Sequence, residues 1–369
     1  MKISIRLSLV LFISLLFNFT VVGQQSAKSY YQQGVEQLNN TKYDLAIASF
    51  DEAIKIDPEY ADAYLQRAKA RQNNQRDLTG AMKDIEKALE LNPSFGEAYY
   101  ERALIRNAQS LTSADKNREI PQAEFTALFN NMLSDLDSAI NYGFKTKDAY
   151  LRRAALKCHD LDNCAGAISD YDAAILLTPD DLIIYTSRAN AKRRIDDLSG
   201  AIADLSEVVT RYNIKQNTSS ESKAMDGKPK PINYQAIETT AVALALTNLG
   251  GLLRQRGSNE LALNAYNQAI AIAPQSPFGY DGRGQYKIAF GDLDEAIADF
   301  TKAIEISGRG AGSYINRGIA LEIQGKSAEA QKDFSKAVEL APHLKDQIAS
   351  MVERAKAARA KYQPKTVSN

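Results

Sequence analysis

The chain of 369 residues repeats itself, and this internal repeat limits the possible folds more than any other feature. Small residues recur at similar intervals, and the last three of them are each 34 residues apart. Around each turn, apolar and small residues stand at helical spacing, which predicts a pair of helices per repeat. One pair cannot bury its apolar faces alone, so the pairs must stack on one another. The eight small residues are Gly34, Ala68, Ala103, Ala154, Ala189, Gly250, Gly284 and Gly318.

Further positions support the same register. In seven repeats an aromatic residue stands four positions before the small residue: Tyr30, Tyr64, Tyr99, Tyr150, Tyr185, Tyr280 and Tyr314. The expected second helix carries a larger residue at one fixed place: Phe50, Ile85, Leu136, Tyr171, Leu205, Tyr266, Phe300 and Phe334. Proline ends most repeats, because it cannot donate the hydrogen bond that a continuing helix needs: Pro58, Pro93, Pro179, Pro274 and Pro342.

This pattern resembles the tetratricopeptide repeat (TPR) family and covers about residues 27–342. The resemblance implies an all-α fold, a right-handed superhelical solenoid of about eight helix hairpins. Tyrosine stands where the family has tryptophan, and Leu246 replaces the aromatic residue of the sixth repeat. After Pro342, apolar residues at helical spacing predict a capping helix over 343–361, followed by a tail over 362–369.

Two insertions interrupt the repeats. The first, about 109–131, lies in the third repeat and predicts a lengthened hairpin. The second, 211–239, is polar and contains proline and lysine, which predicts a mobile linker. We therefore expect repeats one to five in 24–210 and repeats six to eight in 240–342.

The first 23 residues predict a secretory signal peptide. Lys2 and Arg6 precede an apolar run, and small or modest residues stand at the −3 and −1 positions before Gln24. An uncleaved anchor is the alternative, for which the run is rather short. No second run could span a membrane, so we expect an exported protein, periplasmic or secreted.

The charge balance and the motifs argue against several function classes. Lys and Arg number 45, as do Asp and Glu, so the chain is not a general nucleic-acid binder. No phosphate-binding loop, dinucleotide fingerprint or hydrolase motif occurs, so no catalysis and no cofactor is expected. Cys158-His159 does not predict a metal site, because the other histidine, His343, is far along the chain.

Arginine and aspartate recur together in six repeats. The arginine directly precedes the first-helix small residue, and the aspartate directly precedes the second-helix large residue; repeats one and six lack both. This joint occurrence predicts a salt bridge between the two helices of each hairpin. The alternative is a row of arginines that receives an acidic ligand. The predicted pairs are Arg67–Asp84, Arg102–Asp135, Arg153–Asp170, Arg188–Asp204, Arg283–Asp299 and Arg317–Asp333.

The two cysteines, Cys158 and Cys164, lie on either side of the turn in the fourth repeat. In an exported protein they could form a disulfide. Two unpaired thiols are the alternative, because the sequence does not give the distance between them.

The TPR resemblance implies that a protein or peptide partner binds on the concave face, which first-helix positions line. In the last repeat these positions are Ile315, Ile319 and Glu322. A mildly basic middle favours an extended or helical peptide with apolar anchors and some acidic character. A carbohydrate- or peptidoglycan-associated factor of the cell envelope is the alternative, although only Tyr31 and Tyr100 supply aromatic rings for it; an enzyme with an unrecognised site is a weaker one. The candidate binding residues are Tyr31, Leu65, Lys69, Tyr100, Asn107, Asn190, Arg193, Arg194, Arg254, Asp281 and Gln285.

Overall fold

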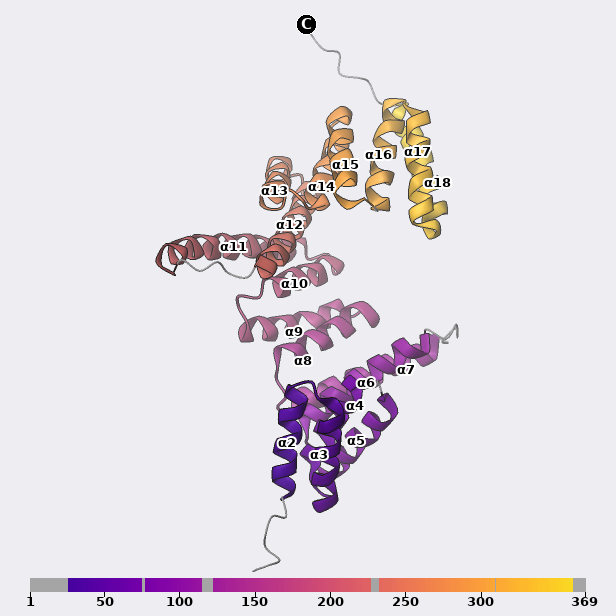
Figure 1. Cartoon of the computed structure of the whole chain (residues 1–369). Coiled ribbons are helices and arrows are strands. Elements are labelled where there is room, and N and C mark those ends of the chain that lie inside the picture. Colours follow the sequence, from indigo (N-terminus) through magenta and orange to yellow (C-terminus); the bar gives the residue numbers. More distant parts are fainter. Residues whose placement is uncertain (1–25, 75–76, 115–121, 227–231, 309, 361–369) are drawn as a thin grey trace, which may run out of the picture. The chain divides into compact units, whose positions relative to one another are not determined.

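The computed structural model describes residues 26–74, 77–114, 122–226, 232–308 and 310–360. The expected signal peptide and the expected tail lie outside these ranges. All secondary structure within them is helical (Figure 1). The chain forms two compact units, Met1–Asp162 and Asn163–Asn369, which are described separately below as the N-terminal and C-terminal units. None of the helices in these ranges combines the length and apolar character needed to cross a bilayer.

The N-terminal unit consists of helix hairpins. Helix α2 packs against α3, α4 against α5, and α6 against α7, and consecutive hairpins contact each other through α3 with α4 and α5 with α6. Its elements are α2 (Ala27–Asn39), α3 (Tyr43–Ile56), α4 (Ala61–Asn74), α5 (Leu78–Leu91), α6 (Gly96–Ala114), α7 (Gln122–Asn141), α8 (Lys147–Ala155) and the π-helical turn η1 (Leu156–Asp160).

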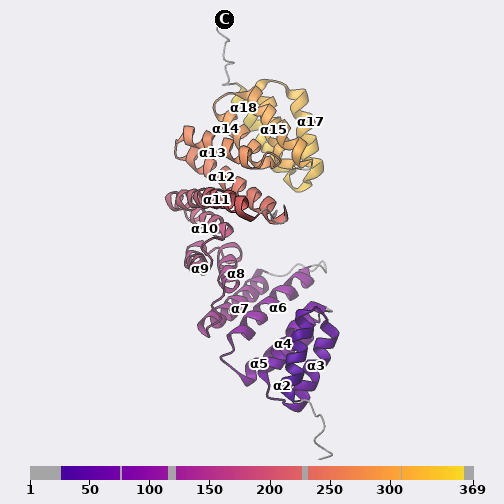
Figure 2. The same ribbon diagram turned by 60° about the vertical axis from the view of Figure 1, so that its left-hand side comes forward.

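The C-terminal unit continues the same arrangement. Its hairpins are α10 with α11, α12 with α13, α14 with α15 and α16 with α17 (Figure 2). Its elements are α9 (Cys164–Leu177), α10 (Leu182–Arg194), α11 (Leu198–Asp226), α12 (Ile232–Gln255), α13 (Asn259–Ile272), α14 (Pro277–Ala289), α15 (Leu293–Ser307), α16 (Ala311–Gln324), α17 (Ser327–Leu340), the 3-10 turn η2 (Pro342–Leu344) and α18 (Lys345–Arg359).

The small first-helix residue allows the two helices of a hairpin to approach closely. A Cβ added at Gly284 would lie 2.7 Å from the Phe300 ring, and one added at Gly318 would lie 2.7 Å from the Phe334 ring. Both rings are almost fully buried. The repeated pairing of a small residue with a large ring is therefore the unit from which the core of each hairpin is built.

The insertion at about 109–131 lengthens the third hairpin. Helix α6 has 19 residues and α7 has 20, whereas α4 and α5 have 14 each. The inner part of this longer hairpin is buried: Phe129, Met132 and Leu136 of α7 pack in one cluster with residues of α6 and α8. The insertion thus adds to the core of the N-terminal unit.

The second insertion corrects the predicted linker. Helix α11 continues for 29 residues to Asp226, and α12 begins at Ile232, so only 227–231 of the insertion lie outside the described helices. Helices α11 and α12 also pack against each other. The polar composition indicated exposure to water, but Gln216, Lys223 and Ala224 are also good helix formers. The boundary between the compact units lies after Asp162, not in this insertion.

Candidate binding face

Five of the six predicted Arg–Asp pairs are salt bridges between the two helices of one hairpin. The shortest N–O distance is 2.6 Å for Arg67–Asp84, Arg102–Asp135 and Arg188–Asp204, and 2.7 Å for Arg283–Asp299 and Arg317–Asp333. In all but the Arg102 pair, Nε and Nη2 donate to different oxygens of the carboxylate. Arg153 and Asp170 belong to different compact units, so their pairing stays a prediction.

Four of the aspartates bind more cations than the sequence indicated. A second cation, four residues after the arginine, binds the same carboxylate in four repeats: Arg71, Arg106, Lys192 and Lys287. The aspartate side chains of these repeats are only 2–7% exposed. In the seventh repeat the hydrogen bonds that Arg283 donates to Asp299 raise the pKa of the Arg283 guanidinium. The arrangement satisfies the buried carboxylates and argues against a row of arginines waiting for an acidic ligand.

The arginines also connect neighbouring repeats, which the sequence analysis missed. The Nη1 atom of Arg188, for example, binds Asp172 in the second helix of the preceding repeat. A side-chain oxygen acceptor 16 residues before the arginine marks this contact in the sequence. The acceptors are Asp51, Asp137, Asp172, Asn267 and Thr301, for Arg67, Arg153, Arg188, Arg283 and Arg317 in that order.

Several predicted binding residues of the N-terminal unit are unsuited to contact a partner. Leu65 is fully buried in the core, and Tyr100 is 8% exposed and accepts a hydrogen bond from Arg152 Nε. Lys69 Nζ donates to Glu97 Oε1 at 2.8 Å. Tyr31 is half-buried against the Tyr60 ring, and burial raises its pKa to about 12. These first-helix positions contact neighbouring helices, because successive hairpins stack closely there.

In the C-terminal unit, four predicted residues line one cavity. Arg193 of α10, Arg254 of α12, and Asp281 and Gln285 of α14 surround a space of about 430 Å³, which we call the groove pocket. Asn190 and Arg194 lie on α10 but do not line it. Its other lining residues are Leu244, Thr247, Asn248, Gly251, Leu252, Gln255, Tyr266, Phe278 and Gly282.

The groove pocket combines exposed cations with one poorly solvated carboxylate. Arg193 and Arg254 are exposed. Asp281 Oδ2 accepts a hydrogen bond from Ser313 Oγ at 2.8 Å, whereas its Oδ1 is buried and has no partner among the described residues. Burial raises the pKa of Asp281 to about 6. Since the ring of Phe278 is 40% exposed, the pocket offers an apolar contact beside its charges.

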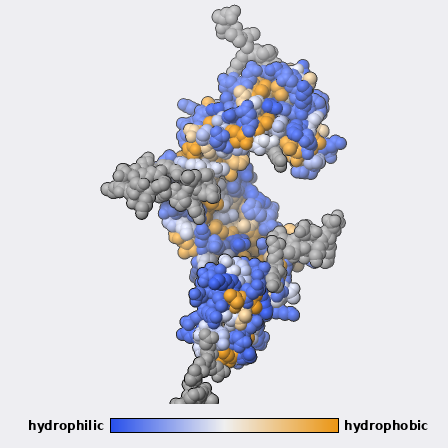
Figure 3. Space-filling model, viewed as in Figure 1, coloured by the Kyte–Doolittle hydropathy of each residue, from blue (hydrophilic) through white to orange (hydrophobic). Residues whose placement is uncertain are grey.

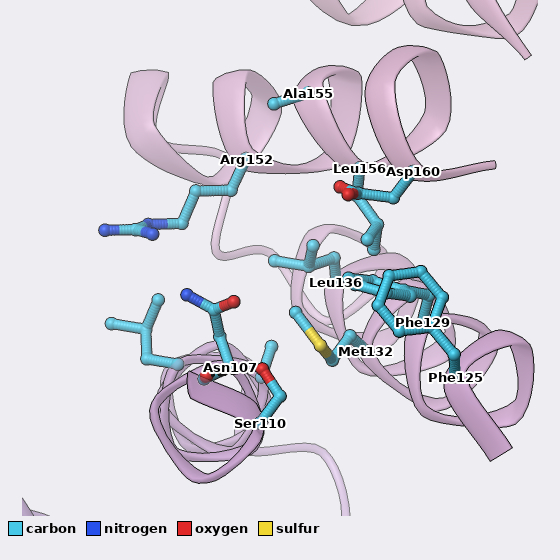
Figure 4. A pocket seen from close by; sticks show the side chains of 12 residues that line it. Asn107, Ser110, Phe125, Phe129, Met132, Leu136, Arg152, Ala155, Leu156 and Asp160 are labelled. Carbon is cyan, nitrogen blue, oxygen red and sulfur yellow. Dashed lines mark hydrogen bonds between the residues drawn. The ribbon is translucent and has the colours of Figure 1, made fainter. Parts of the chain in front are cut away.

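The N-terminal unit has a different cavity, of about 340 Å³, between α6, α7, α8 and η1. We call it the hairpin pocket. Figure 4 shows Phe125, Phe129 and Met132 on one side of it, and Asn107 and Arg152 on the other. Of its lining residues, only Asn107 was predicted as a binding residue. The sequence analysis missed the aromatic side of the pocket, because the insertion, which has no fixed place in the repeat, supplies Phe125 and Phe129.

Cys158 and Cys164 are both disulfide-bonded, and the chain has no free cysteine. Cys158 lies in the π-helical turn η1, which also supplies Leu156 and Asp160 to the hairpin pocket. Within the described ranges, no group of three or more His, Cys, Asp and Glu side chains is placed to hold a metal ion.

Comparison with family models decides the classification. A model described as "TPR repeat" matches 27–75, and one described as "Tetratricopeptide repeat" matches 61–95, 243–276, 280–309 and 311–344. The chain carries tetratricopeptide repeats. Its matched segments are the first two and the last three repeats. TPR proteins are generally non-catalytic scaffolds for protein–protein interaction.

Solved structures support the fold of this TPR protein. A tetratricopeptide repeat protein from Parabacteroides merdae is 17% identical, with a TM-score of 0.52, and the match covers 80% of this chain and 98% of that one. The C-terminal part of a TPR repeat-containing protein from Cytophaga hutchinsonii is 14% identical, with a TM-score of 0.53 and coverage of 78% and 98%. No curated protein matches. These similarities concern the fold alone.

Proposed function

We propose that this TPR protein is an exported, non-catalytic scaffold that binds a protein or peptide partner on its first-helix positions, with the groove pocket as the main contact. The observation that carries the proposal is the convergence of Arg193, Arg254, Asp281 and Gln285 on one open cavity. First-helix residues from three repeats meet there, and an exposed Phe278 adds an apolar contact. Such a mixture suits a polypeptide segment, because a peptide offers carboxylates, amide groups and apolar side chains together.

The charges of the groove pocket indicate which segment fits. The two exposed guanidinium groups favour a partner with acidic side chains, since arginine binds carboxylates through two parallel hydrogen bonds. Export is supported by the charged and apolar N-terminal sequence and by the disulfide-bonded cysteines, because disulfides persist in oxidising compartments.

Affinity capture from envelope extracts tests the proposal. The wild-type chain is compared with the double variant Arg193→Glu/Arg254→Glu and with a control, Arg256→Glu/Lys332→Glu. The control has the same net charge and changes exposed residues that do not line the pocket. We expect the pocket variant to lose at least 90% of the captured partner and the control to retain it. Equal capture by all three chains would contradict the groove pocket as the binding site.

A further inference from the structure

The C-terminal helix α18 does not take the place that a further first helix would occupy. In the array, the first helix α16 packs against α17 within its own hairpin and against α15, the second helix of the preceding repeat, and only slightly against α14. Helix α18 instead packs mainly against α16 and only slightly against α17. It therefore lies over the first helix of the last repeat.

The contacts show which surface α18 covers. Its Ile348 is 3% exposed and joins one apolar cluster with Ile315 and Leu321 of α16. Ile319 packs against the same cluster, as do Met351 and Val352 of α18. Ile315 and Ile319 are the first-helix positions that correspond to Asp281 and Gln285 of the preceding repeat, which line the groove pocket. In the last repeat, positions of the binding face are thus covered by a helix of the same chain.

A polar contact fixes the far end of α18. Glu322 is 4% exposed, and its Oε1 accepts a hydrogen bond from Ser327 Oγ at 3.0 Å. Arg359 Nη1 lies 3.7 Å from the same Glu322 oxygen and donates to Ser327 Oγ at 3.3 Å. The covered surface therefore has an apolar part and an acidic end, and α18 matches both.

The cover is shallow. Of the 15 residues of α18, only Ile348 and Ala355 are buried. Few buried contacts mean a low free energy of local opening, because little apolar surface is lost when the helix detaches. The surface beneath also adjoins the groove pocket, since Ser313 of α16 donates its hydrogen bond to Asp281.

We infer that the α16 surface under α18 is the end of the partner-binding face, and that it fits an amphipathic helix of the partner with an apolar stripe and a basic residue at its C-terminal end. Helix α18 is the resident occupant, and a partner helix of the same pattern takes its place. The inference rests on the proposed function, because it extends the binding face from the groove pocket over the last repeat. The contacts of α18 on this surface indicate the chemistry of the ligand. Ile348 shares an apolar cluster with Ile315, and Arg359 forms an ion pair with Glu322.

A labelled synthetic peptide with the sequence 343–361 serves as the probe. In the full-length wild-type chain, attached α18 competes with the peptide at an effective concentration on the order of millimolar. The full-length variant Ile348→Asp places a carboxylate in the apolar cluster and detaches α18, which leaves the surface open. We expect the peptide to bind this variant at least tenfold more tightly than the wild-type chain, by fluorescence anisotropy. A peptide that itself carries Ile348→Asp serves as the control and should not bind.

Hydrogen exchange on the wild-type chain provides a second measurement. The amides of α18 should exchange at least tenfold faster than those of α16 and α17, while helical circular dichroism shows that the Ile348→Asp chain stays folded. Equal peptide affinity for both chains, no binding to either, or α18 amides as protected as those of α16 would overturn the inference. The groove-pocket variants leave α16 and α18 unchanged, so loss of capture in these variants together with a failed peptide test removes this inference alone. Peptide binding with unchanged capture removes the proposed function instead.

Discussion

The hairpin pocket and the groove pocket differ in origin. The hairpin pocket depends on α7, which the insertion lengthens, and Phe129 on its aromatic side belongs to the core of the N-terminal unit. The groove pocket depends on regular first-helix positions, and its two arginines are exposed. The repeats thus form cavities in two ways. The hairpin pocket is bounded partly by core residues, whereas the groove pocket lies on a surface formed by first-helix side chains. Figure 3 shows such a surface in one view, mostly hydrophilic with small apolar patches.

The largest expected effect concerns the Arg–Asp salt bridges within the hairpins, which occur in both compact units. Asp299→Ala leaves Arg283 and Lys287 beside each other without their carboxylate, and Asp135→Ala does the same to Arg102 and Arg106. We expect each change to lower the free energy of unfolding by about 3–5 kcal/mol, because a partly buried charge loses its partner. Urea unfolding measures the loss.

A double-mutant cycle on Arg283 and Asp299 separates the pair from its surroundings. The loss in the double variant Arg283→Ala/Asp299→Ala should be smaller than the sum of the two single losses, because each single change already breaks the salt bridge. Losses that simply add would show that the two side chains act independently and would contradict a stabilising Arg283–Asp299 salt bridge.

The next largest effect compares how much one phenylalanine of each pocket contributes to stability. Phe129 is 8% exposed in the hairpin pocket, and Phe278 is 40% exposed in the groove pocket. Phe129→Ala should cost about 3–4 kcal/mol of stability, since it leaves a cavity in the core. Phe278→Ala should cost below about 1 kcal/mol and weaken partner binding instead. Thermal unfolding of both variants checks this, and similar losses would remove the distinction between core and surface pockets.

Asp281 provides a pH-dependent test within the groove pocket. Its folded-state pKa of about 6 lies above the ordinary value of 3.8, so its contribution to stability is full below pH 3.8 and is lost as the pH rises through 6. Asp281→Asn should therefore stabilise the protein by about 1–3 kcal/mol above pH 6 and change little near pH 4. Unfolding of both proteins across this range measures the difference, and an equal gain at both pH values would show that charge is not the cause.

The smallest expected change in stability is that of Gly251→Leu, which should nevertheless weaken partner binding at the groove pocket strongly. A Cβ added at Gly251 has its nearest neighbour, Tyr266 Oη, 3.9 Å away, so Gly251→Leu extends into the groove pocket without a clash at its base. Stability should stay the same or rise by up to about 1 kcal/mol, because leucine favours the helix. Affinity for the captured partner should fall at least tenfold. The matched control, Gly312→Leu, fills open space on α16 outside the pocket and should bind normally.

The repeat register predicted most of the fold, and it placed four candidate binding residues that line one cavity. The Arg–Asp pairs and the convergence of Arg193, Arg254 and Asp281 depend on positions that recur with the repeat, so one hairpin gives the geometry of the others. Leu65 and Tyr100 are buried rather than exposed, because burial depends on how closely neighbouring hairpins stack, which a sequence position does not record. The aromatic side of the hairpin pocket and the extension of helix α11 lie in insertions, where no repeat fixes the register.

Hydrogen exchange of the full-length chain with and without its captured partner tests the central claim most directly. The proposed function predicts slower exchange in α12 and α14, which line the groove pocket, while α5 and α7 of the N-terminal unit stay unchanged. Slower exchange confined to the N-terminal unit, with α12 and α14 unaffected, would contradict the assignment of the groove pocket as the partner-binding site.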